Sequence, residues 1–356
     1  MDTYHVIGLM SGTSLDGVDI AHCRFTYKKE NWIYEILHTN TLTYTNTLID
    51  SLRDAETTTA RQLIGLHHAY GKFLGQQVRQ FVTQHGIAPD FVASHGHTIF
   101  HQPDQHVSLQ IGHGAYIAAE AQLPVVCDFR TLDIALGGQG APLVPIGDEL
   151  LFRDYDYCIN LGGIANVSFA MNKQRLAFDI CACNMLLNTV ANQVNEAYDE
   201  NGRLARAGVM QKELLDALNE PPYFTVPPPK SLGKEWVLEH SLKTLNESAA
   251  SVQDKLSTVC HHIAFQIKQS LPLLHQGQHR VLLTGGGAFN GFLAELIQQY
   301  LGQQIRVEVP APELVSFKEA LIFAFLGVLR WRGENNCLKS VTGASQDNIG
   351  GAVYVG

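Results

Sequence analysis

The strongest constraint on the fold is a strand, a small-residue turn and a second strand that occur twice in the chain. The first copy is "YHVIGLMSGTSLDGVDIAHCRF", residues 4–25, and the second is "YCINLGGIANVSFA", residues 157–170. In both, apolar residues flank a turn of small residues, and in the first copy they resume with the alternation of a half-buried strand. A chain of 356 residues also exceeds the usual size of one hydrophobic core. We therefore expect two lobes of one design.

Strand patterns alternate with helical patterns along both lobes, which indicates an α/β protein. The clearest helical spacing covers residues 63–85, 184–198 and 248–274, and a last helix is expected from Lys318 or Glu319. The glycine-rich stretch "LGGQGAPLVP" predicts the boundary between the lobes. We expect an N-terminal lobe of residues 1–140, which residues 340–356 can join, and a C-terminal lobe of residues 141–339.

Composition excludes several classes of partner. The net charge is −9 and no basic block occurs, which disfavours nucleic acids and anionic membranes as partners. Apolar runs are too short for a membrane span, and the start "MDTYHVIGLM" lacks the pattern of a signal peptide. Seven cysteines at irregular spacing are typical of reduced thiols. The sequence thus predicts a cytoplasmic protein that binds a small molecule.

Three glycine-rich turns next to strands can each present backbone N–H groups to phosphate oxygens. They lie at residues 11–17, at Gly162 and Gly163, and at Gly285–Gly287 in "RVLLTGGGAFNGFLAEL". A single turn of this kind is often only structural, but three in two similar lobes favour nucleotide binding. The chain has neither GxxxxGK followed by Ser or Thr nor GxGxxG opening a helix. This arrangement resembles the two-lobed, actin-like ATPase (ribonuclease H-like) fold, with ATP in a cleft between the lobes.

Phosphoryl transfer also needs a carboxylate base and a metal, usually Mg²⁺. Asp179 follows the predicted strand "RLAFD" and precedes a small-residue turn into a helix, so it can face a cleft or cap that helix. Glu319 is a second candidate, with an ordinary first-turn acid as the alternative. Asp16, Asp19 and Asp128 complete the acidic candidates.

Other reactive side chains have plain alternatives. The fork of Arg130 matches a substrate carboxylate, although a surface ion pair explains it equally well. The group His95, His97 and His101 could suggest zinc, but polar lining or surface is favoured, because no supporting cysteine or carboxylate motif accompanies it. Cys181 and Cys183 lack the CxxC spacing of redox sites and are expected to be buried thiols.

The chain resembles the anhydro-N-acetylmuramic acid kinases, a bacterial family of cell-wall recycling, over nearly its whole length. The two most specific motifs are "GLMSGTSLDGVD" and "DIALGGQGAPLVP". Shorter matches are "HGHT", "LQIG", "DFR", "LGGIANVS", "ARAG", "PPPKSLGKE", "TGGGAFN", "KEALIFAFL" and "SVTGAS". The resemblance implies a homodimeric enzyme that uses ATP and water to open the 1,6-anhydro ring of its sugar and phosphorylate O6, giving N-acetylmuramate 6-phosphate.

The resemblance also implies roles for individual residues. Asp179 would take a proton from the attacking water, Glu319 would support it, and Thr98 and Arg130 would contact the sugar. Magnesium would bind through the ATP phosphates, with Asp16 as the candidate protein ligand. The expected nucleotide contacts are Gly12, Thr13, Ser14, Leu15, Asp16, Gly17, Val18, Asp19, Gly162, Gly163, Gly285 and Gly286.

Two departures from the family pattern leave alternatives open. The chain has "DICACN" where the family usually has DTGPGN, which removes two glycines beside the expected base, and "HGHT" replaces HGQT. A kinase for another anhydrosugar, such as levoglucosan, is one alternative. A nucleotide-binding regulator with weakened catalysis is the other.

Overall fold

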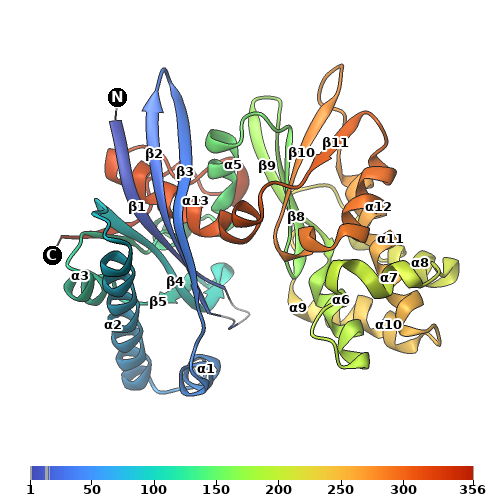
Figure 1. Cartoon of the computed structure of the whole chain (residues 1–356), viewed down its shortest axis with the longest axis horizontal. Helices are drawn as coiled ribbons and strands as arrows, with labels where there is room; N and C mark the ends of the chain where they lie inside the picture. The colour runs from blue at the N-terminus through green and yellow to red at the C-terminus, as the bar shows by residue number, and fades with distance from the viewer. Residues whose placement is uncertain (1, 13–14, 16, 356) are drawn as a thin grey trace. The chain divides into compact units, whose positions relative to one another are not determined.

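The computed structural model divides the chain into two compact units, each built around one mixed β-sheet (Figure 1). It describes residues 2–12, 15 and 17–355. Unit 1 comprises residues 1–151 and 317–356, and unit 2 comprises residues 152–316. The two sheets and the helices packed on them confirm the predicted α/β class.

Unit 1 contains a seven-stranded sheet. Its strands are β1 (Asp2–Ser11), β2 (Val18–Lys28), β3 (Asn31–Leu42), β4 (Phe91–Gln102), β5 (Val107–Ile111), β6 (Val125–Cys127) and β12 (Ala352–Tyr354). Its helices are α1 (Asn46–Arg53), α2 (Ala60–His85), α3 (Gly114–Ala121), α4 (Thr131–Ala135), α5 (Val144–Leu151), most of α13 (Pro312–Arg332) and α14 (Lys339–Thr342).

Unit 2 contains a five-stranded sheet. Its strands are β7 (Tyr157–Leu161), β8 (Ile164–Met171), β9 (Gln174–Ala182), β10 (His279–Thr284) and β11 (Ile305–Glu308). Its helices are α6 (Asn184–Ala191), α7 (Arg203–Ala207), α8 (Lys212–Asn219), α9 (Lys234–Val237), α10 (Lys243–Glu247), α11 (Val252–Ser270) and α12 (Gly291–Leu301).

The two sheets share one strand order. In unit 1, β3-β2-β1 form an antiparallel meander, and β4 and β6 follow in parallel on the other side of β1. In unit 2, β9-β8-β7 form the meander, and β10 and β11 follow in parallel. The repeated hairpin of the sequence therefore marks a repeated topology, which is that of the actin-like, ribonuclease H-like fold.

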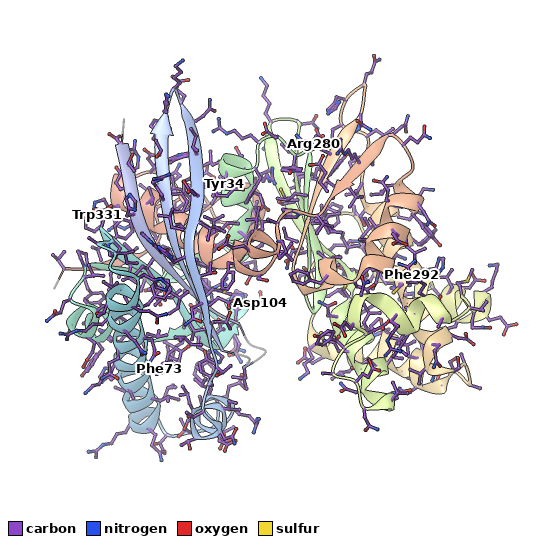
Figure 2. All side chains as sticks on the ribbon, viewed as in Figure 1. Tyr34, Phe73, Asp104, Arg280, Phe292 and Trp331 are labelled. Carbon is purple, nitrogen blue, oxygen red and sulfur yellow. The ribbon has the colours of Figure 1, made fainter. Side chains whose placement is uncertain are left out.

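The sheet of unit 1 is covered on both faces. Ile7 and Leu9 of β1 belong to the apolar cluster that includes the buried residues of α2, and Phe73 on α2 packs at its margin (Figure 2). Between them, Gly8 faces the opposite side, where a Cβ atom would overlap the carbonyl of Ala320 on α13. On that side the Trp331 ring stacks on Phe91 at 4.9 Å (Figure 2). Alternation along β1 thus divides one strand between two helix layers.

The observed division of the chain differs from the predicted one because the glycine-rich stretch is not a linker. Unit 1 continues past residue 140 to the end of α5. The fully buried carboxylate of Asp133 accepts hydrogen bonds from the Gly140 backbone at 2.8 Å, from Thr342 at 2.9 Å and from Asn348 at 2.8 Å. These bonds fix the stretch inside unit 1, together with residues near the C-terminus.

The last long helix also begins earlier than predicted. α13 starts at Pro312, a position that suits proline because the first turn of a helix needs no intrahelical N–H donor. The chain returns to unit 1 at residue 317, within this helix. Within the described ranges, no helix is long and apolar enough to cross a membrane.

Candidate active site

The turn between β1 and β2 combines two unusual backbone positions. Leu15 and Gly17 both have positive φ angles, 62° and 147°. A Cβ atom on Gly17 would overlap the Leu42 carbonyl, so only glycine fits there. Gly12, Val18 and Asp19 lie on either side of this turn. The expected nucleotide contacts Thr13, Ser14 and Asp16 lie outside the described residues.

A buried chain of hydroxyl groups supports the start of this turn. The Ser11 hydroxyl lies 2.8 Å from His97 Nδ1 and 2.6 Å from the Tyr44 hydroxyl, which in turn lies 2.6 Å from Tyr70. Burial lowers the pKa of His97 to about 4, so its ring is neutral at physiological pH. His97 is thus a structural partner of the turn.

Hydrogen bonds from neighbouring segments hold Arg130, and it forms no surface ion pair with any residue that the structure describes. Its guanidinium donates to His95 Nε2 at 2.8 and 3.1 Å and to the Gly140 carbonyl at 2.6 Å. Burial and the Arg130 charge hold the pKa of His95 well below its usual range, so His95 acts as a neutral acceptor. These bonds leave the remaining donors of Arg130 for a ligand, while its position is fixed.

Glu319 lies within α13, past its first turn, so the first-turn interpretation is wrong. The carboxyl is partly shielded from water, and burial raises its pKa, while Lys318 and Arg130 act in the opposite direction and Asp19 adds to the rise. Lys318 itself forms a buried ion pair with Asp148 at 2.7 Å. Unit 1 therefore brings Arg130 and Asp19 each within electrostatic reach of Glu319.

Thr98 lies near the end of β4, where β5 pairs with it. Its hydroxyl accepts a hydrogen bond from Gln110 Nε2 at 3.4 Å, and Gln110 also donates to Ser108 at 3.0 Å. The third histidine of the sequence cluster, His101, has its Nδ1 3.2 Å from Ser108. Hydrogen bonds thus account for both ring nitrogens of His95 and for one ring nitrogen each of His97 and His101.

Asp179 lies inside β9 and does not cap a helix. β9 continues to Ala182, and α6 begins after Cys183, which makes no side-chain capping bond, so the capping interpretation is wrong. The strand continues because Ile180 and Cys181 are buried in the apolar core of unit 2. Within this strand the carboxylate of Asp179 is half-buried and accepts a hydrogen bond from the Leu232 backbone N–H at 2.9 Å.

Burial raises the pKa of Asp179, and the Leu232 N–H partly opposes this by favouring the ionised form. The backbone of Asp179 is held as well. Its N–H donates to the Lys230 carbonyl at 3.2 Å, and its carbonyl accepts from the Tyr223 hydroxyl at 2.6 Å. A carboxylate with a raised pKa on a fixed backbone is suited to accept a proton.

The residues around Asp179 include three that sequence reasoning missed: Tyr223, Lys230 and Leu232. Tyr223 and Lys230 belong to the proline-rich segment "EPPYFTVPPPK", and Leu232 follows it; hydrogen bonds join all three to Asp179 in β9. Lys230 Nζ donates to the Tyr223 carbonyl at 3.1 Å and lies 4.6 Å from the centre of the Tyr223 ring. The motif "PPPKSLGKE" was the available signal, because its three consecutive prolines restrict the backbone and indicate a constrained segment.

The second hairpin tip supports a helix start. The Gly162 carbonyl accepts from the Asn184 N–H at 3.1 Å, and the Gly163 carbonyl accepts from Cys183 at 2.9 Å and Met185 at 3.2 Å. Asn184 also donates through its side chain to the Leu161 carbonyl at 2.9 Å. Gly162 and Gly163 are therefore joined to the N-terminus of α6.

The third turn borders a cavity of about 500 Å³ within unit 2. Gly285 has a φ angle of 81°, and a Cβ atom on it would lie 2.5 Å from Asn160 Oδ1, so this turn needs glycine. The cavity has the size of a small-molecule site. It is lined by Asn184, Leu187, Asn188, Tyr198, Asp199, Glu200, Asn201, Gly286, Gly287, Phe289 and Asn290.

A family profile described as anhydro-N-acetylmuramic acid kinase matches residues 4–356. The chain belongs to the anhydro-N-acetylmuramic acid kinase family. Among curated relatives, an anhydro-N-acetylmuramic acid kinase of Francisella tularensis subsp. novicida is 34% identical, with 98% of each chain covered. One of Hydrogenovibrio crunogenus is 35% identical, covering 98% of this chain and 97% of the relative.

Two solved structures match this chain at low sequence identity. Component A of (R)-2-hydroxyglutaryl-CoA dehydratase from Acidaminococcus fermentans is 13% identical with a TM-score of 0.46, covering 90% of this chain and 96% of that one. A ROK hexokinase from Thermus thermophilus is 12% identical with a TM-score of 0.36, covering 92% and 99%.

Proposed function

We propose that this protein is an ATP-dependent kinase that hydrolytically opens 1,6-anhydro-N-acetylmuramic acid and phosphorylates O6, giving N-acetylmuramate 6-phosphate and ADP. Membership of the family supports this assignment. The observation that carries it is the carboxylate of Asp179, which is half-buried, has a raised pKa and is held by the Leu232 N–H. The place of the reaction is peptidoglycan recycling and amino-sugar catabolism.

In the proposed reaction, a water molecule attacks the anomeric carbon C1 while Asp179 accepts one of its protons. The C1–O6 bond breaks, and its electron pair remains on O6. O6 then attacks the γ-phosphorus of ATP, the bond to the β,γ-bridging oxygen breaks, and ADP leaves. Positive charge that develops at C1 favours a nearby carboxylate, as in inverting glycoside hydrolysis.

Residues of unit 1 have the complementary task of holding the sugar. We assign Arg130 and Thr98 to sugar contacts, because each is fixed by hydrogen bonds from within unit 1 and retains polar capacity. Glu319 lies within electrostatic reach of Arg130, and we assign it to the support of this part of the site. Fixed donors of this kind reduce the entropy lost when a substrate binds.

The nucleotide contacts follow from the three turns. We assign the β1–β2 turn, including Gly12 to Asp19, to the ATP phosphates. Gly162 and Gly163 are also assigned to the phosphates, and Gly285 and Gly286 are assigned to the nucleoside. The cavity of about 500 Å³ beside Gly286 supports the last assignment. Mg²⁺ prefers phosphate oxygens and one or two carboxylates, and the carboxylate of Asp19 beside the turn is a donor of that kind. When bound, Mg²⁺ neutralises charge on the phosphates.

We also propose that the protein works in the cytoplasm as a homodimer, as the family resemblance implies.

The "DICACN" segment gives no support to a different sugar preference. Ile180, Cys181, Ala182 and Cys183 are buried in the core of unit 2, where they replace backbone freedom with apolar packing.

The test is a coupled ADP-release assay with 1,6-anhydro-N-acetylmuramic acid and levoglucosan. We expect turnover of the first sugar, and loss of roughly three or more orders of magnitude in Asp179→Asn, because an amide cannot accept the water proton. Asp216→Asn on α8 is the matched control, since Asp216 is exposed and pairs only with Lys212 in the described structure. Equal rates in Asp179→Asn and the parent would refute the assigned base, and faster turnover of levoglucosan would refute the substrate.

A further inference from the structure

A second cavity, of about 150 Å³, lies entirely within unit 1. It is bordered by α2, β5, the start of α3 and the terminal strand β12. Its polar lining includes His67, His113, Ser94, Asp128 and Tyr354. None of these residues has a role in the reaction described above.

Two histidines of the cavity have their tautomers set by the backbone. His67 Nδ1 accepts from the Gly112 N–H at 3.0 Å, and His113 Nδ1 accepts from the Ala115 N–H at 3.2 Å, where it caps α3. In each neutral ring the proton is therefore on Nε2. Burial and neighbouring histidines lower the pKa of His67 to about 4 and also lower that of His113, so both rings are neutral donors.

The cavity also contains an acceptor and an unused hydroxyl. Asp128 has a left-handed backbone, with φ of 59°, and its Oδ1 accepts from Thr131 at 2.5 Å. Ser94 is fully buried, and no hydrogen-bond partner for its Oγ occurs among residues 2–12, 15 and 17–355. A buried polar group without a partner is costly, which indicates a ligand or water at this point.

Both side chains assigned to the sugar are bonded to residues that line this cavity. Thr98 accepts from Gln110, and Arg130 donates to His95. The cavity is therefore a direct neighbour of the proposed sugar contacts. At the opposite wall, a Cβ atom on Gly114 would lie 2.5 Å from Cys127 Sγ, so glycine is needed for the thiol to close the cavity.

We propose that this cavity receives the acetamido group of the sugar and that His67, His113 and Asp128 determine specificity for it. The inference rests on the proposed function. An acetamido group has one carbonyl acceptor and one N–H donor, which match the two imidazole donors and the carboxylate, and its methyl group suits the side of Cys127 and Leu109. A carboxylate substituent fits poorly, because Asp128 would repel it and the imidazoles are neutral.

The test compares 1,6-anhydro-N-acetylmuramic acid with the analogue in which a hydroxyl replaces the acetamido group at C2. We expect the parent enzyme to prefer the acetamido sugar at least about tenfold in kcat/KM, because a site built for hydrogen bonds rejects an analogue that lacks them. In His113→Asn the preference should fall about tenfold, mainly through KM. Asparagine remains a good helix cap, so folding should be kept.

His68→Asn is the matched control, since His68 adjoins His67 on α2 but does not line the cavity. We expect it to keep the parent preference, and we expect His113→Asn to change turnover of the hydroxyl analogue less than about twofold. Equal losses for both sugars in His113→Asn, or no preference in the parent, would overturn the inference. A parent enzyme that phosphorylates neither sugar would instead refute the proposed function, and the inference with it.

Discussion

Asp133 offers a direct test of how unit 1 holds Arg130 in place. Its carboxylate is fully buried and accepts from the Gly140 N–H, from Thr342 and Asn348, and from the Cys337 thiol at 3.0 Å. Gly140 in turn provides the carbonyl that accepts from Arg130 at 2.6 Å. One side chain thus connects the glycine-rich stretch to the C-terminal segment and, through Gly140, to a proposed sugar contact.

The substitution Asp133→Asn keeps the shape but replaces one acceptor oxygen by a donor. If the remaining oxygen stays with the three side-chain donors at Oδ1, the new amide nitrogen takes the position of Oδ2. There it meets the Gly140 N–H, which is also a donor, so the Gly140 N–H and the new amide N–H are both left buried and unpaired. Each unpaired donor costs about 1–3 kcal/mol, so we expect a loss of about 2–6 kcal/mol in the free energy of unfolding. The Gly140 carbonyl should also shift, which should raise KM for the sugar at least about fivefold.

Urea unfolding followed by tryptophan fluorescence measures the first effect. The assay uses a Trp236→Phe background, because Trp32 and Trp331 then report on unit 1 alone. Asp347→Asn is the control, since Asp347 is exposed and accepts one bond, from the Lys339 N–H. A loss below about 1 kcal/mol for Asp133→Asn, with KM unchanged, would refute the reasoning.

Two further predictions concern the reacting groups. Because burial raises the pKa of Asp179, the base remains protonated at a pH where an exposed aspartate is ionised. On acidification, kcat/KM should therefore fall at a higher pH than it would with an ordinary aspartate as the base. Leu232→Pro removes the N–H that stabilises the ionised form, so it should move this acidic limb of the pH–rate profile to higher pH. An unchanged limb in Leu232→Pro would contradict that bond's role. Gly17→Ala should raise KM for ATP at least about tenfold, because its Cβ overlaps the Leu42 carbonyl; normal ATP kinetics in this variant would show that the turn does not hold phosphate.

The repeated topology was predictable because its signals are local. Small-residue turns between alternating strands mark β1–β2 and β7–β8 in the sequence and in the structure. The ends of α2 also carry local sequence signals, since Thr59 and Gln62 form a capping box and Gly86 ends the helix with a φ of 59°. The helix predicted over 184–198 is shorter in the structure: α6 ends at Ala191, a 3₁₀ turn covers Asn192–Val194, and Asn195 stops it with a φ of 61°.

What the sequence could not show depends on contacts between distant segments. Asp133 accepts hydrogen bonds from Gly140, Thr342 and Asn348, and no local sequence pattern indicates that the glycine-rich stretch is fixed in this way. The environment of Asp179 is of the same kind, because Tyr223 and Leu232 bond to it from 44 and 53 positions further along the chain. The cavity of His67 and His113 likewise joins α2 to the start of α3.

The topology of unit 1 has a consequence for biosynthesis. Most of helix α13 and the edge strand β12 belong to unit 1, yet these residues follow unit 2 along the chain. As the polypeptide emerges from the ribosome, residues 152–316 are complete while the earlier sheet still lacks one covering helix, and the face of Gly8 and Phe91 stays open until then. Residues 1–151 therefore keep apolar surface accessible to chaperones or to aggregation until the last forty residues have been translated.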